Sequence, residues 1–195
     1  MNVRWKTLFF ASASFVMFNA GTAHAICLLQ GTDGNDYLQA PNDGCHYAIL
    51  GKGGNDNMIG NNLSGCIFPG TNGAPPGSDL MAGAALQPEF YVWDNAPPSQ
   101  ETGDVISNFD QSKGDGIFLG GPCLYESLSC TFIGAAQFHG IAGEVRFQLS
   151  ASTSMPSQIQ ADFDGDGHTD FVINLTNRAV VTTGISFTFP DCPPG

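Results

Sequence analysis

Alternating apolar and polar positions run through the second half of the chain. Five segments share a period of two and carry β-branched and aromatic residues: GDVISNF (103–109), DGIFL (115–119), EVRFQLS (144–150), DFVINLT (170–176) and GISFTF (184–189). This period is typical of strands with one buried face. No segment has the pattern of a long amphipathic helix, so the sequence predicts a mainly β protein.

Glycine and turn residues dominate the first half and form a repeat. GTDGNDYLQ (31–39) and GKGGNDNMI (51–59) superimpose over nine residues, and PNDGCHYAIL (41–50) and GSDLMAG (77–83) are weaker copies. In each unit, glycines permit positive φ, an aspartate supplies a carboxylate, and an apolar residue two places later begins a short inward-facing strand. The repeat therefore predicts a stack of short strands joined by acidic turns.

The N-terminus has the features of a secretory signal peptide. Arg4 and Lys6 form a basic start, residues 7–20 an apolar run, and Ala23-His24-Ala25 a small-residue cleavage site. We expect residues 1–25 to be removed and the protein to be exported. Cys27 raises the alternative of a lipoprotein, although Ile26 occupies the place where a small residue is usual. No later segment approaches the roughly 20 apolar residues of a membrane-spanning helix.

The net charge of the chain limits the classes of partner that it is expected to bind. The net charge is −12, and it becomes −14 without the signal peptide, because four basic residues then face eighteen acids. Such an excess argues against nucleic acid and anionic membranes and points to cations. Disorder is the alternative for an acidic chain, but fifteen phenylalanines argue against it.

Six cysteines lie in the predicted mature part, and an even number in an exported chain indicates disulfides. The spacing in CLYESLSC predicts a Cys123–Cys130 pair and leaves the remaining connectivity open. A zinc site is the competing interpretation, but no Cys-x-x-Cys pair supports it.

The segment DFDGDGHTDF (162–171) has the spacing of a calcium loop. It places Asp162, Asp164 and Asp166 at the first, third and fifth positions, Gly167 at the sharp turn, the His168 carbonyl at the seventh and Asp170 at the ninth. The alternatives are a solvated acidic turn and a helix-loop-helix hand. FVINL continues as a strand, so we expect a calcium loop on a β scaffold.

The repeats resemble the calcium-binding nonapeptide of repeats-in-toxin proteins, which stack as a parallel β-roll. The twenty-residue separation of the two best copies is close to one full coil, although Thr32 and Lys52 stand where a second glycine is usual. The resemblance implies Ca²⁺ held by aspartates and turn carbonyls, from Asp33, Asp36, Asp56, Asp79, Gly34, Gly51 and Gly53. The alternative for each aspartate is a turn-forming role.

A second resemblance covers residues 77–190. GDVISNFDQSKGDGIFLGG, FIGAAQFHGIAGEVRFQ, DFDGDGHTDFVINL and ISFTF follow the order of motifs in the C-terminal domain of serralysin-type metalloproteases. It implies a β-roll-like half (26–92) packed on a β-sandwich-like half (93–195), stabilised by disulfides. Asp104 and Asp110 correspond to positions at the junction, where they bind calcium or cap a turn.

Catalytic motifs are missing from the sequence. It contains no His-Glu-x-x-His and no Gly-x-Ser-x-Gly, and the histidines at 46, 139 and 168 are isolated. A Ser/His/Asp triad assembled only in space stays an alternative. We therefore expect a non-catalytic calcium-binding protein, extracellular or periplasmic, that folds with Ca²⁺. The rival hypotheses are a surface that binds an extracellular protein or matrix, with GTNGAPPGS (70–78) as a candidate loop, and a hydrolase.

Overall fold

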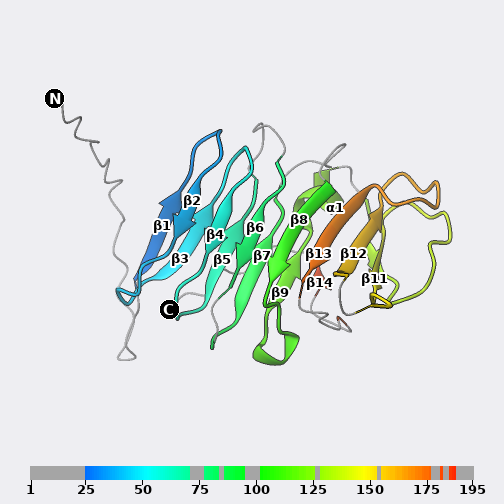
Figure 1. Cartoon of the computed structure of the whole chain (residues 1–195). Coiled ribbons are helices and arrows are strands. Elements are labelled where there is room, and N and C mark those ends of the chain that lie inside the picture. Colours follow the sequence, from blue (N-terminus) through cyan, green and yellow to red (C-terminus); the bar gives the residue numbers. More distant parts are fainter. Residues whose placement is uncertain are drawn as a thin grey trace, which may run out of the picture.

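Two β-sheets face each other across an apolar core in the computed structural model of the chain (Figure 1). The structure describes residues 25–70, 77–83, 86–94, 102–125, 128–152, 155–176, 181 and 185–187. The predicted mainly β fold is confirmed. The predicted signal peptide lies outside the described residues except for Ala25.

Each sheet combines strands from both halves of the chain. Within the described residues, the six-stranded sheet has the order β1 (Ile26–Gln30), β3 (His46–Leu50), β5 (Gly65–Phe68), β7 (Glu89–Val92), β9 (Gly116–Phe118), β14 (Ile185–Ser186). The eight-stranded sheet has the order β10 (Thr131–Phe132), β11 (Glu144–Gln148), β12 (Ser157–Asp162), β13 (Phe171–Leu175), β8 (Thr102–Ser107), β6 (Leu80–Ala82), β4 (Asn57–Ile59), β2 (Tyr37–Gln39). A 3-10 turn η1 (Gln111–Lys113) and a short helix α1 (Gly120–Tyr125) connect strands.

A parallel β-roll occupies the first half and continues into the second as far as β9. Strands β1 to β9 pass alternately to one sheet and the other, and the neighbours within each sheet are parallel. Leu38 pairs with Met58, Met58 with Met81 and Met81 with Ile106, so successive coils take 20, 23 and 25 residues. The twenty-residue separation of the two sequence repeats is therefore one full coil.

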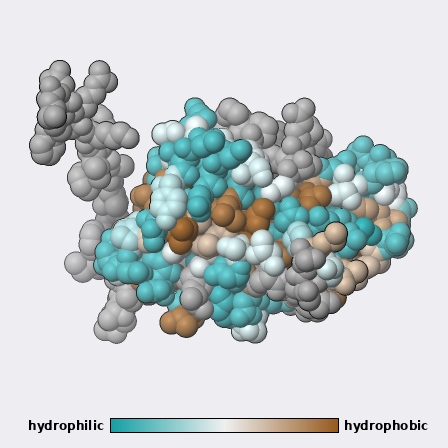
Figure 2. Space-filling view, in the orientation of Figure 1, coloured by the Kyte–Doolittle hydropathy of each residue, from teal (hydrophilic) through white to brown (hydrophobic). Residues whose placement is uncertain are grey.

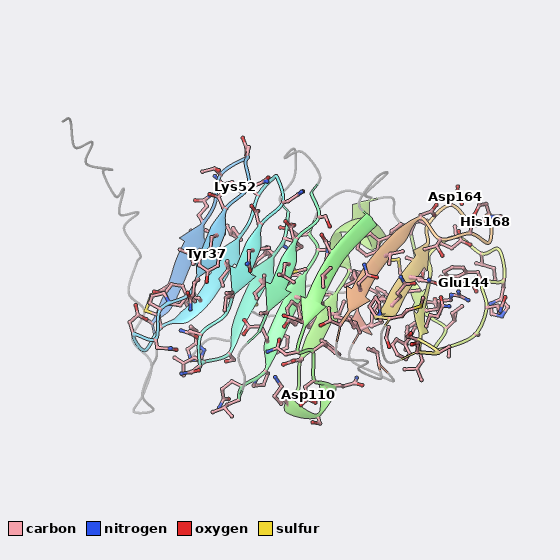
Figure 3. The ribbon with its side chains drawn as sticks, viewed as in Figure 1. Tyr37, Lys52, Asp110, Glu144, Asp164 and His168 are labelled. Atoms are coloured by element: carbon pink, nitrogen blue, oxygen red, sulfur yellow. A yellow bond between two sulfur atoms is a disulfide. The ribbon has the colours of Figure 1, made fainter. Side chains whose placement is uncertain are left out.

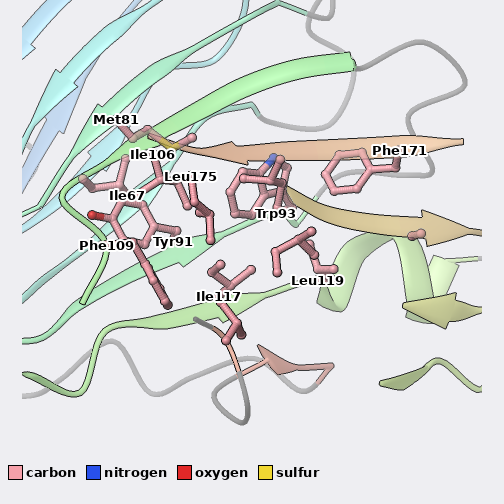
Figure 4. Close-up of a cluster of buried hydrophobic side chains, with 14 of the residues drawn as sticks. Ile67, Met81, Tyr91, Trp93, Ile106, Phe109, Ile117, Leu119, Phe171 and Leu175 are labelled. Carbon is pink, nitrogen blue, oxygen red and sulfur yellow. The ribbon is translucent and has the colours of Figure 1, made fainter. Parts of the chain in front are cut away.

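The core lies between the inner faces of the two sheets (Figure 4). The eight-stranded sheet contributes the fully buried Met58, Met81 and Ile106, and the six-stranded sheet contributes the fully buried Ile67 and Ile117. Each such side chain stabilises the fold by about 1.5–3 kcal/mol when it leaves water. The inward position two places after each repeat aspartate thus builds the core, as the repeat predicts.

The second half extends the same sheets. β8 pairs in parallel with β6 on one side and with β13 on the other, and β13, β12 and β11 follow as an antiparallel series. Trp93 packs edge-on against Phe171, with 6.1 Å between ring centroids, and ties the two parts of the core together. Both sheets continue across the predicted boundary between residues 92 and 93.

Disulfides fasten both halves. Cys123 is bonded to Cys130, which confirms the predicted pair, and Cys27 is bonded to Cys45. Cys66 is also disulfide-bonded, while Cys192 lies outside the described residues. No helix in the part of the chain that the structure describes is long and apolar enough to cross a bilayer.

Candidate metal centres

The loop between β12 and β13 gathers three carboxylates. One oxygen from each of Asp162, Asp164 and Asp166 lies within 4.8 Å of the others. Asp162 ends β12 and is completely buried, whereas the other two are exposed, and Figure 3 shows Asp164 at the end of the molecule beyond these strands. Gly167 has φ +83°, as the sharp turn at the sixth position requires.

Backbone amides hold these carboxylates in place. Asp162 accepts hydrogen bonds from the N–H of Gly165 at Oδ1 (2.7 Å) and of Gly167 at Oδ2 (2.9 Å). Asp164 accepts from the N–H of Asp166 (3.0 Å). The loop therefore keeps three like charges close together through its own backbone, although like charges repel at this range.

Asp170 and His168 occupy other places in the loop. Asp170 Oδ2 accepts from the N–H of Phe163 (2.6 Å) and of Asp164 (3.2 Å), so its carboxylate ties the end of the loop to its beginning. The His168 side chain is exposed, with Nδ1 3.3 Å from Asp166 Oδ1. Direct coordination by Asp170 and by the His168 carbonyl stays a prediction.

Four repeat aspartates form a ladder along the roll. The N–H of Asp36 donates to Asp56 Oδ1 (2.8 Å), that of Asp56 to Asp79 Oδ1 (2.7 Å), and that of Asp79 to Asp104 Oδ1 (2.9 Å). Asp36, Asp56 and Asp79 each immediately precede a strand of the eight-stranded sheet, and Asp104 lies inside β8. The parallel register therefore stacks the four residues. The ladder joins four of the predicted metal-binding residues.

Burial raises the pKa of two carboxylates in the ladder, Asp56 and Asp104. Asp56 Oδ2 is buried and has no hydrogen-bond partner, and burial raises the pKa of Asp56. Asp104 is only 2% exposed, and its Oδ2 accepts from the Trp93 indole N–H (2.8 Å). Burial raises the pKa of Asp104 to about 6, against the lowering effect of its two hydrogen bonds. A buried carboxylate oxygen without a partner is costly unless a proton or a cation compensates it.

Glycine is required beside the ladder. A Cβ at Gly51 would lie 2.5 Å from Asp56 Oδ2 and 2.4 Å from the Pro69 carbonyl, and a Cβ at Gly31 would lie 2.6 Å from the Gly51 carbonyl. These contacts are closer than any real Cβ permits. The glycines thus let turn carbonyls and aspartate oxygens approach one another.

The remaining turn residues differ in their surroundings. The Gly53 N–H donates to the Thr32 carbonyl (3.3 Å), and Thr32 in turn donates to Asp36 Oδ2 from its N–H (2.6 Å) and its hydroxyl (2.8 Å). Gly34 stacks under Gly54, where a Cβ on Gly54 would lie 2.7 Å from the Gly34 carbonyl carbon. Asp33 is exposed on the outer turn and stands apart from the ladder. Its role as a ligand stays a prediction.

The six-stranded sheet carries a further buried carboxylate, Asp115, that the repeat pattern does not predict. The Glu89 N–H donates to Asp115 Oδ1 (2.9 Å), and Oδ2 of the same carboxylate accepts from the Asp110 N–H (2.8 Å). Asp110 itself caps η1 through the Ser112 N–H (2.9 Å). Asp115 directly precedes β9, just as Asp36 precedes β2, so its position before a strand was the available signal.

One serine–histidine contact bears on the triad alternative. Ser64 Oγ lies 3.1 Å from His46 Nδ1, but this nitrogen also lies 2.6 Å from the Ser64 carbonyl. A carbonyl only accepts, so Nδ1 carries the proton and donates it to the carbonyl. In this tautomer Nδ1 does not accept the serine proton.

The candidate metal ligands in the three-aspartate loop and in the ladder are oxygen atoms. Carboxylates and backbone carbonyls are the ligands that Ca²⁺ prefers, and no softer ligand accompanies them in the three-aspartate group. The unpartnered Asp56 oxygen and the convergent carboxylates of the loop both fit a hard cation.

The comparisons with known proteins concern the fold. The solution structure of the AlgE6R3 subunit from the Azotobacter vinelandii mannuronan C5-epimerase is similar to this chain, with a TM-score of 0.51, 20% identity and 80% of each chain covered. No protein-family model matches the chain, and no curated protein matches it significantly. At this identity the likeness supports the mainly β, roll-type architecture alone.

Proposed function

We propose that this is an exported, non-catalytic calcium-binding protein of the repeats-in-toxin type, whose folding is coupled to Ca²⁺. The observation that carries the proposal is the convergence of Asp162, Asp164 and Asp166 within 4.8 Å on a β scaffold. The repeat motifs and the serralysin-like order of the second half support the same assignment.

The ion would act on stability. Bound Ca²⁺ neutralises carboxylates that the backbone holds together, in a chain with a net charge of −12. One site with free calcium at 100 times its dissociation constant adds about 2.7 kcal/mol to the free energy of unfolding. Extracellular modules bind calcium with dissociation constants of roughly 0.1–1 mM. We therefore expect the folded state to become more stable when the protein reaches a calcium-rich compartment.

Thermal melting tests the proposal. We expect calcium to raise the melting temperature of the disulfide-intact protein relative to chelator, followed by far-UV circular dichroism. For a domain of this size, about 2.7 kcal/mol corresponds to a rise of roughly 5–10 °C. An unchanged melting temperature at saturating calcium would contradict the proposal.

A paired variant assigns the effect to the loop. The double change Asp164→Asn and Asp166→Asn removes two exposed carboxylates, so we expect calorimetry to show about tenfold weaker calcium binding at this site, or none. Asp43→Asn is the control for the loss of one exposed charge outside the loop, because Asp43 lies before β3 and interacts with Cys45 and Tyr47. If both variants lost calcium affinity equally, the overall negative charge and not the loop would account for the binding.

Export is the untested part of the proposal. The predicted signal peptide and the disulfides fit passage through an oxidising compartment. Mass spectrometry of the mature protein is expected to find an N-terminus at Ile26, and an intact Met1 would contradict cleavage.

A further inference from the structure

Arg146 is held in a fixed position by uncharged groups. It projects from β11 on the outer face of the eight-stranded sheet, where Nε donates to Gln160 Oε1 (2.8 Å) and Nη2 to Gln148 Oε1 (3.4 Å). The guanidinium carbon lies 4.8 Å from the centre of the Phe138 ring. A long, flexible side chain is thus ordered before any ligand arrives.

A relay of amides on β12 and β13 orients Arg146. Gln160 Nε2 donates to Gln158 Oε1 (2.8 Å), and Gln158 Nε2 donates to Asn174 Oδ1 (3.0 Å). Gln160 donates along β12 and Gln158 donates across to β13, so the Gln160 nitrogen is engaged and its oxygen is left to face the guanidinium. The relay fixes the direction in which Arg146 presents its remaining N–H groups.

No carboxylate neutralises Arg146 within the described residues. The ion pairs there belong to Lys113, His139 and His168. Glu144, two positions before Arg146 on the same strand, accepts from the His139 N–H and lies 2.6 Å from its Nδ1. In a chain with eighteen acids and six basic residues, an ordered guanidinium without an acidic partner is a ready anion site.

A cavity opens beside this guanidinium. Its volume is about 310 Å³, and it is lined by Ala135, Gln137, Arg146, Phe147, Gln148 and Leu149. This volume lies at the lower end of small-ligand sites, which span about 300–1,000 Å³. The two glutamine amides offer both donors and acceptors, and Ala135 and Leu149 provide apolar edges.

We propose that this cavity binds a small organic carboxylate that carries hydroxyl groups, the chemistry of a sugar acid. The planar guanidinium matches a carboxylate, and amides pair with hydroxyls because both groups donate and accept. One positive charge balances one negative charge, so a monocarboxylate fits better than doubly charged phosphate on an acidic protein.

Nuclear magnetic resonance titration tests this proposal. Glucuronate, glucose and inorganic phosphate are added separately to the calcium-loaded, disulfide-intact protein at constant ionic strength and free calcium. We expect saturable glucuronate shifts at the Arg146 Nε–H and the Gln148 side-chain amide, with glucose and phosphate binding at least about tenfold more weakly. No saturable shift with glucuronate, or equal or tighter binding of glucose or phosphate, would overturn the proposal.

Variants separate the site from general charge. Arg146→Lys keeps the charge but loses the planar fork, so we expect about tenfold weaker glucuronate binding, and Arg146→Gln should abolish it. Gln137→Ala changes an exposed lining residue and is expected to weaken binding without disturbing the fold. Lys113→Gln removes the same charge at η1 and should leave binding intact. Unchanged binding in both Arg146→Gln and Gln137→Ala would refute the site.

Discussion

At the scale of single residues, Lys52 shows where the repeat departs from its usual pattern. Lys52 has φ +79°, in the left-handed region, and stands where the resemblance expects glycine (Figure 3). In this region a residue with a Cβ loses about 1 kcal/mol or more of conformational free energy relative to glycine.

Lys52→Gly is therefore expected to stabilise the protein. The free energy of unfolding should rise by about 0.5–1 kcal/mol, measured by urea denaturation. Lys52→Ala is the control, because it removes the same charge and keeps the Cβ. If both variants are equally stable, the backbone conformation at residue 52 is not the cause.

Asp104 gives the protein a pH dependence in the absence of calcium. Burial raises its pKa to about 6 in the folded state, above the ordinary value of 3.8. Protonation therefore favours the folded state: this stabilisation is complete below the unfolded pKa and is lost as the pH rises through about 6.

In chelator, lowering the pH from about 7 to 5 should add about 1 kcal/mol to the free energy of unfolding through Asp104. The measurement is urea denaturation of the wild type and of Asp104→Asn at both pH values. Subtracting the variant removes the contributions of other acids. An identical pH dependence in the two proteins would exclude Asp104 as the titrating group.

At the scale of elements, the ladder separates two roles for the repeat aspartates. Asp56 Oδ1 accepts a backbone N–H, a role that asparagine can also fill, while the buried Oδ2 has no partner. The structural role needs only an oxygen, whereas the calcium-binding role needs the negative charge.

Asp56→Asn is therefore expected to have opposite effects in the two conditions. In chelator the variant should be as stable as the wild type or more stable by about 1 kcal/mol, because no buried charge remains. With calcium it should be the less stable protein. Melting curves in both conditions test this, and a loss of stability of equal size in both would assign Asp56 a purely structural role.

The sequence predicted the strands whose alternation carries β-branched and aromatic residues, and it missed β12, which has few of them. The five predicted segments correspond to β8, β9, β11, β13 and β14. β12 was missed because SQIQAD carries polar residues in place of β-branched and aromatic ones, and its strand conformation depends on its pairing with β11 and β13 on either side. Such tertiary pairing is not visible in local propensity.

The candidate site was predictable to a similar degree. The three-aspartate loop and the stacked positions of the repeat aspartates follow from spacing, because glycine and aspartate recur at regular positions along the chain. The Glu89–Asp115 pair does not, since it depends on register across the six-stranded sheet. The relay that orients Arg146 likewise depends on the antiparallel register of β11, β12 and β13.

At the scale of the whole molecule, the two halves form one continuous structure. β8 lies between the roll and the antiparallel series, and Asp104 on β8 ends the ladder. Hydrophilic side chains cover most of one face, with hydrophobic ones gathered toward its middle (Figure 2). Neighbouring coils are joined by the hydrogen bonds of the ladder and by one hydrophobic core. We therefore expect cation binding in the roll to stabilise the packing of the second half, and the reverse.

The contact between Trp93 and Asp104 also supplies an optical probe. The chain has two tryptophans, and Trp5 lies in the predicted signal peptide, so the mature protein would keep Trp93 alone. Its indole N–H donates to the carboxylate at the end of the ladder, and its ring packs on Phe171 at the start of β13, in the antiparallel series. The tryptophan emission, excited selectively over that of the tyrosines, therefore reports on the junction itself, without any label.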